Sequence, residues 1–405
     1  MKEKAIQHQS LKEYGFVMKS IYEVCETVTD YVAAGSFADL KKNVEYLSEP
    51  NYAQLIRTVD LKSRFLKGNF IYVSKKAFDY LWRVNLNCES IILPNIGNCG
   101  EVYYVVPEKL PYKNNVLATN AILVRSLKES NKYLFYIFQS KHFQDELKRI
   151  TSPVGQTKFN KTELKNICIP IPSRKVQEEI VKILDSFTNL IDALNEELSL
   201  RQKQFEYYRE KLLTFDDKSI NVNITPLGEI GNVCMCKRIM RNETNNEGGI
   251  PFYKIGTFGG IADSFISKDK FEEYKNKYNY PKLGDILISA SGTIGKTVVF
   301  DGKPSYYQDS NIVWIDNDET KVINSFLRYI YTVIDWKVDD GGVIKRLYNT
   351  NIRSTLITYP KEKAVQKSIV EKLDAFESLI SSLKEEIALR QKQYEYYREK
   401  LLTFE

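Results

Sequence analysis

One segment of the sequence has the residue types and spacing of a phosphate-binding site. Ala290–Thr297 reads ASGTIGKT and fits a relaxed phosphate-loop pattern, in which backbone N–H groups and a lysine hold phosphates. Such a loop follows a strand and opens a helix whose N-terminus binds the phosphate. Here Val298–Phe300 follows, which indicates a strand, and the corresponding Gly100–Val102 offers neither Lys nor Thr. The sequence therefore predicts a turn without a nucleotide cofactor.

Residue types that serve catalysis or metal binding are sparse elsewhere. The chain has two histidines, His8 and His142, and six cysteines, of which Cys234 and Cys236 are the one close pair. A zinc site needs further ligands beside such a pair, and a Ser or Cys nucleophile usually needs a histidine base. No motif for amino methylation of bases, no dinucleotide fingerprint and no paired-carboxylate nuclease pattern stands out. We expect no catalytic residue, no metal and no cofactor, hence a protein that recognises rather than catalyses.

Composition limits the kinds of binding partner and the cellular compartment that we expect for this chain. The 58 Lys and Arg residues exceed the 52 Asp and Glu residues, for a formal charge of +6, which permits a nucleic-acid partner without requiring one. No apolar run approaches the roughly 18 residues of a membrane span. The N-terminal segment lacks the apolar core of a signal peptide, and scattered cysteines are typical of reduced thiols. We expect a cytoplasmic chain without a membrane partner.

A long segment occurs twice. Arg201–Phe215 recurs at Arg390–Phe404 with a single substitution, and Val176–Phe215 matches Val365–Phe404 at 27 of 40 positions. Internal repeats of this kind decide the fold, because each copy is one structural unit. The chain is therefore expected to consist of two related halves, each ending in the same segment.

Both copies of the repeat predict a long helix. Apolar residues recur at alternating steps of four and three, with no Pro or Gly, which is the seam of a coiled coil. At a rise of 1.5 Å per residue, a helix of this length is a rod of roughly 57 Å. We expect the two rods to pack antiparallel, with a pseudo-twofold relating the halves. The seam positions are Ile180, Leu184, Phe187, Ile191, Leu194, Leu198, Phe205, Tyr208 and Leu212, and Ile369, Leu373, Phe376, Ile380, Leu383, Ile387, Tyr394, Tyr397 and Leu401.

Each half carries a mixed globular unit before its helix. Short alternating apolar runs lie between turn residues, and both halves show a strand, a glycine turn and a second strand, at Glu89–Gly100 and Gly284–Gly295. We expect the turn glycines to be needed for positive φ. The predicted fold is α+β: globular units at 1–172 and 226–360, long helices at 173–215 and 361–405, and a linker at 216–225.

This combination resembles the specificity subunit of type I restriction–modification systems over essentially the whole chain. The residues that carry the resemblance are GSF at Gly35–Phe37, GDILISASGTIG at Gly284–Gly295, the IPIP…VQEEIV transition at Ile169–Val181, and the duplicated RQKQ[FY]EYYR. The first half departs from the glycine-turn pattern, with PNIGNCG in place of SASGTIG. The departure concerns its recognition surface rather than its class.

The resemblance implies two target-recognition domains that read the two halves of a split sequence in double-stranded DNA. The helices act as a ruler between them and carry two copies of a methyltransferase subunit. Methyl transfer belongs to that partner, and cleavage belongs to a motor–nuclease subunit in systems that have one. The chain itself is then not an enzyme.

Residues for DNA contact are chosen by chemistry and by their position in polar loops, because Arg, Lys, Asn and Gln reach base edges and phosphates. The acid-free loop 151–161 and the loop 341–351 hold corresponding places before the two transitions. The predicted DNA-binding residues are Arg57, Lys62, Arg64, Gln156, Lys158 and Asn160 in the first half, and Lys237, Arg238, Arg241, Ser291, Lys296, Lys345, Arg346 and Asn349 in the second.

The identical outer faces of the two helices predict two docking sites for one partner, although a recent duplication would also leave them identical. The predicted docking residues are Gln202, Lys203, Tyr207 and Arg209, with Gln391, Lys392, Tyr396 and Arg398. Two alternatives stay open: a coiled-coil scaffold with two modules for protein or carbohydrate ligands, and a nucleotide-dependent enzyme that uses Ala290–Thr297.

Overall fold

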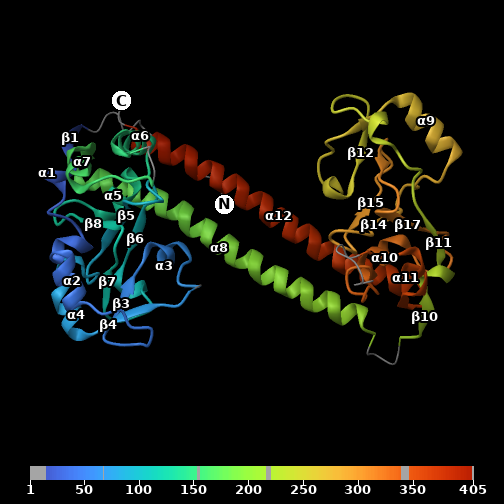
Figure 1. Cartoon of the computed structure of the whole chain (residues 1–405), viewed down its shortest axis with the longest axis horizontal. Coiled ribbons are helices and arrows are strands. Elements are labelled where there is room, and N and C mark those ends of the chain that lie inside the picture. Colours follow the sequence, from blue (N-terminus) through green and yellow to red (C-terminus); the bar gives the residue numbers. More distant parts are fainter. Residues whose placement is uncertain (1–14, 67, 153–155, 216–219, 339–345, 404–405) are drawn as a thin grey trace. The chain divides into compact units, whose positions relative to one another are not determined.

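A computed structural model describes residues 15–66, 68–152, 156–215, 220–338 and 346–403. The chain divides into two compact units: Met1–Leu194 with Glu386–Glu405 form unit 1, and Asn195–Glu385 form unit 2. Each unit contains a globular domain and parts of both long helices (Figure 1).

The globular domain of unit 1 is built on three small sheets, with orders β1-β9, β2-β8-β5-β6 and β4-β3-β7. Their strands are β1 Phe16–Ser20, β2 Thr27–Asp30, β3 Ala53–Ile56, β4 Ile71–Val73, β5 Ser90–Pro94, β6 Tyr103–Val105, β7 Asn115–Leu117, β8 Ala121–Arg125 and β9 Cys168–Pro172. The helices are α1 Ile21–Val24, α2 Phe37–Asn43, α3 Thr58–Lys62, α4 Lys75–Tyr80, α5 Asn131–Ile137, α6 Lys141–Ile150, α7 Lys161–Asn166 and the start of α8 Arg174–Leu213.

The globular domain of unit 2 repeats this topology, with sheet orders β10-β18, β11-β17-β14-β15 and β13-β12-β16. Its strands are β10 Val222–Pro226, β11 Gly231–Cys234, β12 Ile250–Tyr253, β13 Phe265–Ile266, β14 Ile286–Ser289, β15 Thr297–Val299, β16 Tyr306–Tyr307, β17 Ile312–Asn317 and β18 Leu356–Pro360. Its helices are α9 Lys268–Lys277, α10 Asn324–Ile330, α11 Asn349–Ser354 and the start of α12 Lys363–Leu402. Strand β10 takes in residues 222–225, which the sequence interpretation placed in the linker.

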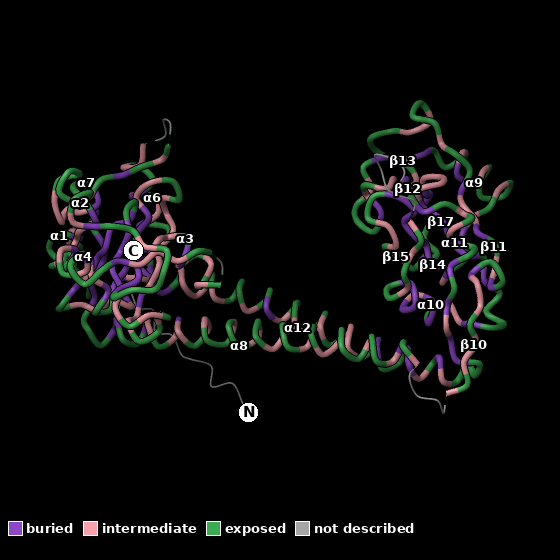
Figure 2. The backbone as a smooth tube through the Cα atoms, turned by 60° about the horizontal axis from the view of Figure 1, so that its bottom comes forward, coloured by how far each residue is buried: buried purple, intermediate pink, exposed green. Residues whose placement is uncertain are grey.

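The sheets follow from the apolar runs. Strands β5 and β14 are buried at every residue, as expected of central strands with a continuous apolar sequence. Each is followed by its glycine turn and by the second strand, β6 or β15, as predicted. The turn after β14 therefore leads into a strand and not into the helix that a phosphate loop requires. Buried residues gather inside the domains, while the long helices show mainly exposed and intermediate residues (Figure 2).

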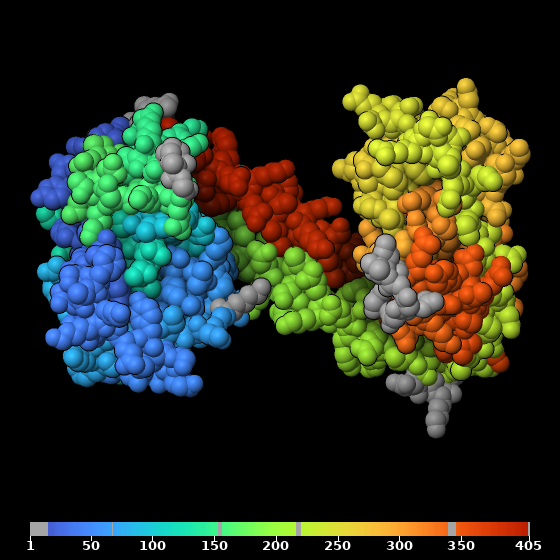
Figure 3. Space-filling view, viewed as in Figure 1, coloured from blue at the N-terminus to red at the C-terminus, as the bar shows by residue number. Residues whose placement is uncertain are grey.

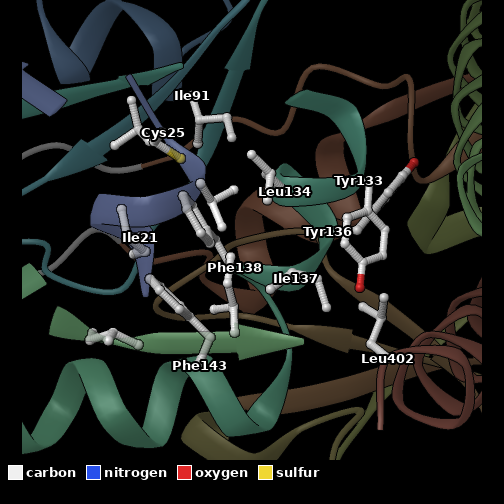
Figure 4. Close-up of a cluster of buried hydrophobic side chains, with 14 of the residues drawn as sticks. Ile21, Cys25, Ile91, Tyr133, Leu134, Tyr136, Ile137, Phe138, Phe143 and Leu402 are labelled. Carbon is white, nitrogen blue, oxygen red and sulfur yellow. The ribbon is translucent and has the colours of Figure 1, made fainter. Parts of the chain in front are cut away.

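The long helices are anchored into the cores of both units. In unit 1, Ile180 and Leu184 of α8 and Leu401 and Leu402 of α12 join the apolar cluster around Phe138 (Figure 4). The last turns of α12, red in Figure 3, lie against the blue and green domain of this unit. In unit 2, the end of α8 and the start of α12 join the core in the same way.

The predicted antiparallel seam is present within each unit. Phe187 of α8 stacks on Tyr397 of α12 in unit 1, with ring centroids 5.3 Å apart. In unit 2, Tyr208 of α8 stacks on Phe376 of α12 at 5.4 Å. The two contacts join corresponding positions of the repeat with the roles of the helices exchanged, and the helices run in opposite directions (Figure 1). The α+β fold with paired antiparallel helices is confirmed.

The thiols provide a test of this packing. Burial raises the pKa of Cys25 and of Cys236 to about 12, whereas Cys88 and Cys168 are exposed. Only the thiolate reacts with iodoacetamide, and a thiol with a pKa near 12 is ionised to about 1 part in 10,000 at pH 8. We expect Cys88 and Cys168 to be alkylated first, with Cys25 and Cys236 protected until denaturant is added, as measured by peptide mass spectrometry. Early labelling of either thiol would contradict the burial of Cys25 in unit 1 or of Cys236 in unit 2.

Candidate nucleic-acid interface and helix docking surface

The glycine turns have the backbone conformation that the sequence predicts. Gly97 and Gly100 in unit 1 have φ of 86° and 106°, and Gly292 and Gly295 in unit 2 have φ of 68° and 77°. L-residues avoid this region, which glycine adopts freely. At Gly295 an added Cβ would also lie 2.6 Å from Nε1 of Trp336. These glycines therefore shape the turns.

In each unit the glycine turn is joined to the loop that precedes a short helix, α7 in unit 1 and α11 in unit 2. The backbone N–H of Phe159 donates to the carbonyl of Asn95 at 3.1 Å, and Lys158 forms a β-bridge with Ile96. In unit 2 the N–H of Leu347 donates to the carbonyl of Ala290 at 2.9 Å. The glycine turn and this loop are distant in sequence, and they thus form one surface in each domain.

Lys158 and Arg346 occupy the corresponding place on these two surfaces. Arg346 forms its β-bridge with Ser291, as Lys158 does with Ile96. Both side chains are exposed, and neither forms an ion pair with a described carboxylate. Within the described residues, no carboxylate neutralises the charge at either position.

Several other predicted contact residues are committed to partners inside the protein. Arg57 forms a two-pronged ion pair with the fully buried carboxylate of Asp60, and this hydrogen bond raises the pKa of Arg57. Lys62 pairs with Glu101. Asn160 caps α7, because its Oδ1 accepts from the N–H of Glu163 at 2.9 Å. These contacts give the three residues a structural role that loop position alone does not reveal.

The remaining predicted residues differ in exposure and in their partners. Arg238 pairs with Asp309 at 2.9 Å, Lys296 donates to the carbonyl of Phe258, and Ser291 is buried. Exposed residues are Arg64, which reaches Asp192 at 3.4 Å, together with Gln156, Lys237 and Arg241. Asn349 is half-buried at the start of α11. Lys345 lies outside the described residues.

The predicted docking residues divide between two faces of the helices. Gln202 and Arg209 line a groove of about 500 Å³ between α8 and α12 in unit 2. Tyr207, by contrast, is 59% exposed, and Tyr396 at the corresponding place in unit 1 is 61% exposed. Successive helix residues are rotated by 100°, so Lys203 shares the face of Tyr207, and Lys392 shares that of Tyr396.

The structure adds a leucine to this outer face, which sequence reasoning missed. Leu200 and Leu389 are 59% and 57% exposed, and each lies two turns before the exposed tyrosine, on the same side of its helix. The sequence feature that could have indicated these leucines is an apolar residue that lies outside the coiled-coil seam in both copies of the repeat. We call Leu200, Lys203, Tyr207 and Lys211, with their counterparts Leu389, Lys392, Tyr396 and Lys400, the docking faces.

The two docking faces have the same internal geometry. The ring of Tyr207 meets that of Tyr208 edge-on at 5.3 Å, and Tyr396 meets Tyr397 in the same way at 5.3 Å. The ammonium of Lys211 lies 5.9 Å from the centre of the Tyr207 ring, and Lys400 repeats this contact at 5.9 Å. Each exposed tyrosine is therefore supported by a ring of the helix seam. Exposed aromatic side chains on a rigid element suit a protein partner.

Comparison with known proteins identifies the family. The family model for the type I restriction modification DNA specificity domain matches residues 15–200 and again 220–389. The chain belongs to the type I restriction–modification specificity subunits. The two matches correspond to the two halves of the repeat, and the family predicted from the sequence motifs is confirmed.

Relatives agree with this assignment, and a solved structure shares the fold. A Haemophilus influenzae protein named as a type I restriction enzyme specificity subunit is 50% identical over 301 residues, which are 71% of this chain and 76% of that protein. The specificity subunit of EcoR124I/EcoR124II from Escherichia coli is 32% identical over 59% of this chain and 63% of its own length. The crystal structure of a specificity subunit from M. genitalium shares the fold, with a TM-score of 0.57 at 14% identity, over 100% of this chain and 98% of that one.

Among the described residues, no cluster of three or more metal-ligating side chains occurs. None of the helices in the described part combines the length and the apolar character needed to cross a bilayer.

Proposed function

We propose that this specificity subunit binds a bipartite sequence in double-stranded DNA, with one globular domain for each half-site, and itself catalyses no reaction. The observation that carries the proposal is the surface made twice by a glycine turn and a pre-helix loop. Each copy presents a cation, Lys158 or Arg346, at the corresponding place, and neither pairs with a carboxylate in the described part of the chain. The residues around the two cations differ, so the two half-sites differ and the target need not be palindromic.

The same proposal gives the long helices the role of a double docking site for a methyltransferase subunit. The two docking faces are identical in residue type and in ring geometry, and one lies in each unit. Two copies of one partner would therefore find the same surface twice on one chain. A motor–nuclease subunit would join through this assembly in systems that have one. A solved structure with a TM-score of 0.58 to this chain comes from work on complex assembly of the type I system.

Selection from random DNA tests the proposal. The full chain, assembled with a type I methyltransferase subunit, is incubated with a pool of random duplexes, and the bound fraction is sequenced. We expect two short conserved blocks at a fixed separation. Replacing residues 220–360 with the corresponding region of another specificity subunit should change one block and leave the other intact.

The outcomes separate the proposal from its rivals. An assembled complex that enriches no sequence would favour the scaffold with ligand-binding modules. Binding that depends on added nucleotide would favour an enzyme that uses Ala290–Thr297. A single undivided block would contradict the assignment of one half-site to each domain.

A further inference from the structure

Arg346 is held by neutral groups, which distinguishes it from Arg57 and Arg238. Its Nη2 donates to Oδ1 of Asn311 at 3.1 Å, and its backbone is bridged to Ser291. Arg57 and Arg238, by contrast, are neutralised by Asp60 and Asp309. A guanidinium oriented by an amide keeps its full charge, whereas a carboxylate would cancel the charge and compete for the same donors.

Asn311 is built into the same surface by its own backbone. The carbonyl of Asn311 accepts from the N–H of Ala290 at 2.7 Å, so its position is fixed to the start of the glycine turn. Its Oδ1 accepts from the hydroxyl of Ser291 at 2.9 Å as well as from Arg346. Since both partners of Oδ1 are donors, the amide orientation is set and its N–H₂ group is directed away from them.

The carboxylate that precedes Asn311 in the chain is already paired. Asp309 lies two residues before Asn311 and accepts from Nε of Arg238 at 2.9 Å. Arg346 is therefore not drawn toward Asp309. One of its five N–H donors goes to Asn311, and within the described residues no carboxylate takes up the others.

The geometry points to guanine as the base read by this site. We propose that Asn311 positions Arg346 to contact the O6 and N7 acceptors of a guanine in the half-site read by unit 2; the inference rests on the proposed function. Two acceptors side by side on the major-groove edge match the planar fork of arginine, and this pair is the commonest specific contact to DNA bases. Asn311 acts here as a positioning residue, and Arg346 is the specificity-determining one.

Unit 1 lacks this arrangement at the corresponding place. Asn120 corresponds to Asn311, because its carbonyl accepts from the N–H of Asn95 at 3.1 Å as that of Asn311 does from Ala290. However, Ile96 stands where Ser291 is, and no side chain of the described part orients Lys158. A lysine on a flexible stem is a point charge suited to a phosphate. Lys158→Ala is therefore a matched control at the same place in the fold.

The test compares the base preference of variants in the complete complex with the methyltransferase subunit. We expect Arg346→Ala to lose about 10- to 100-fold of its discrimination at one guanine position of one block. Arg346→Lys should keep the affinity for random DNA and lose most of that discrimination. Asn311→Asp, which keeps the shape of the side chain and adds a charge, should weaken the same position. Lys158→Ala should instead lower the affinity for all sequences alike and reduce the slope of log affinity against log salt by about 1.

Each other result counts against the inference in a distinct way. A uniform loss in Arg346→Ala, like that expected for Lys158→Ala, would make Arg346 a phosphate contact. Loss of discrimination at a base other than guanine would overturn the base assignment. Unchanged preference in Asn311→Asp would remove the positioning role. If the wild-type complex enriches no sequence at all, the proposed function itself fails, which the assay reports before any variant is compared.

Discussion

Replacing both exposed tyrosines, Tyr207→Ala with Tyr396→Ala, is expected to abolish binding of the methyltransferase subunit. Each ring is about three-fifths exposed and is supported by a neighbouring tyrosine of the seam, so it offers a rigid aromatic surface. Exposed tyrosines of this kind often dominate an interface, and truncating one costs on the order of 2 kcal/mol or more, about 30-fold in affinity.

Because the docking face occurs twice, the prediction can be tested by counting the methyltransferase subunits bound per chain. Each single variant should bind one methyltransferase subunit per chain with normal affinity, and the double variant should bind none at concentrations that saturate the wild type. Native mass spectrometry of the mixed subunits measures the stoichiometry directly. Circular dichroism should be unchanged, because neither ring belongs to an apolar core.

A matched control lies beside each tyrosine. Glu206 and Glu395 recur in both copies and are exposed, but each lies about 100° around the helix from its tyrosine. Glu206→Ala with Glu395→Ala should leave two subunits bound. If the double tyrosine variant also binds two, or if the glutamates matter equally, the outer faces are not the docking sites.

The sequence was most informative about the long helices. An apolar period of four and three without Pro or Gly predicted helices at 173–215 and 361–405, and the structure has them at Arg174–Leu213 and Lys363–Leu402. The helix pattern is local, so the chain reveals it without knowledge of the fold. The positive φ of the turn glycines was predicted because it, too, depends on a local pattern, a glycine-rich run between two apolar runs.

The candidate interface was less predictable, because its contacts join distant parts of the chain. Lys62 and Glu101 are 39 residues apart, and Arg238 and Asp309 are 71 apart. A charged residue in a polar loop looks the same in the sequence whether or not such a partner exists. Asn311 was not singled out for this reason: its contact with Arg346 spans 35 residues and depends on the pairing of three loops.

The glutamine of the VQ motif illustrates what repetition alone cannot explain. Gln177 and Gln366 match in the two copies, which marked them as part of the transition into the helix. The structure shows that both side chains are fully buried and connect each helix to its own domain. The backbone N–H groups that they accept from, those of Ser130 and Ile323, lie more than forty residues earlier in the chain, where no local pattern indicates them.

Gln366→Leu is expected to lower the free energy of unfolding of unit 2 by about 3 kcal/mol. The side chain accepts from the N–H of Ile323 at 2.9 Å and donates to the carbonyls of Pro360 and Lys321 at 2.7 and 3.0 Å. Leucine keeps most of the volume but leaves three buried backbone groups without partners, at roughly 1 kcal/mol each. Hydrogen exchange in urea, followed by mass spectrometry, measures the loss for each unit separately.

Because of the repeat, the equivalent variant can be made in unit 1, and each variant is a control for the other unit. In unit 1, Gln177 accepts from the N–H of Ser130 and donates to the carbonyl of Pro172, both at 3.0 Å, so Gln177→Leu should destabilise unit 1 and spare unit 2. Because the two glutamines share no partner, the double variant should show both losses unchanged. Lys367→Ala, at an exposed neighbour on α12, should stay within about 0.5 kcal/mol of the wild type. A loss in Gln366→Leu no larger than that of Lys367→Ala would mean that the buried glutamines do not fasten the helices to the domains.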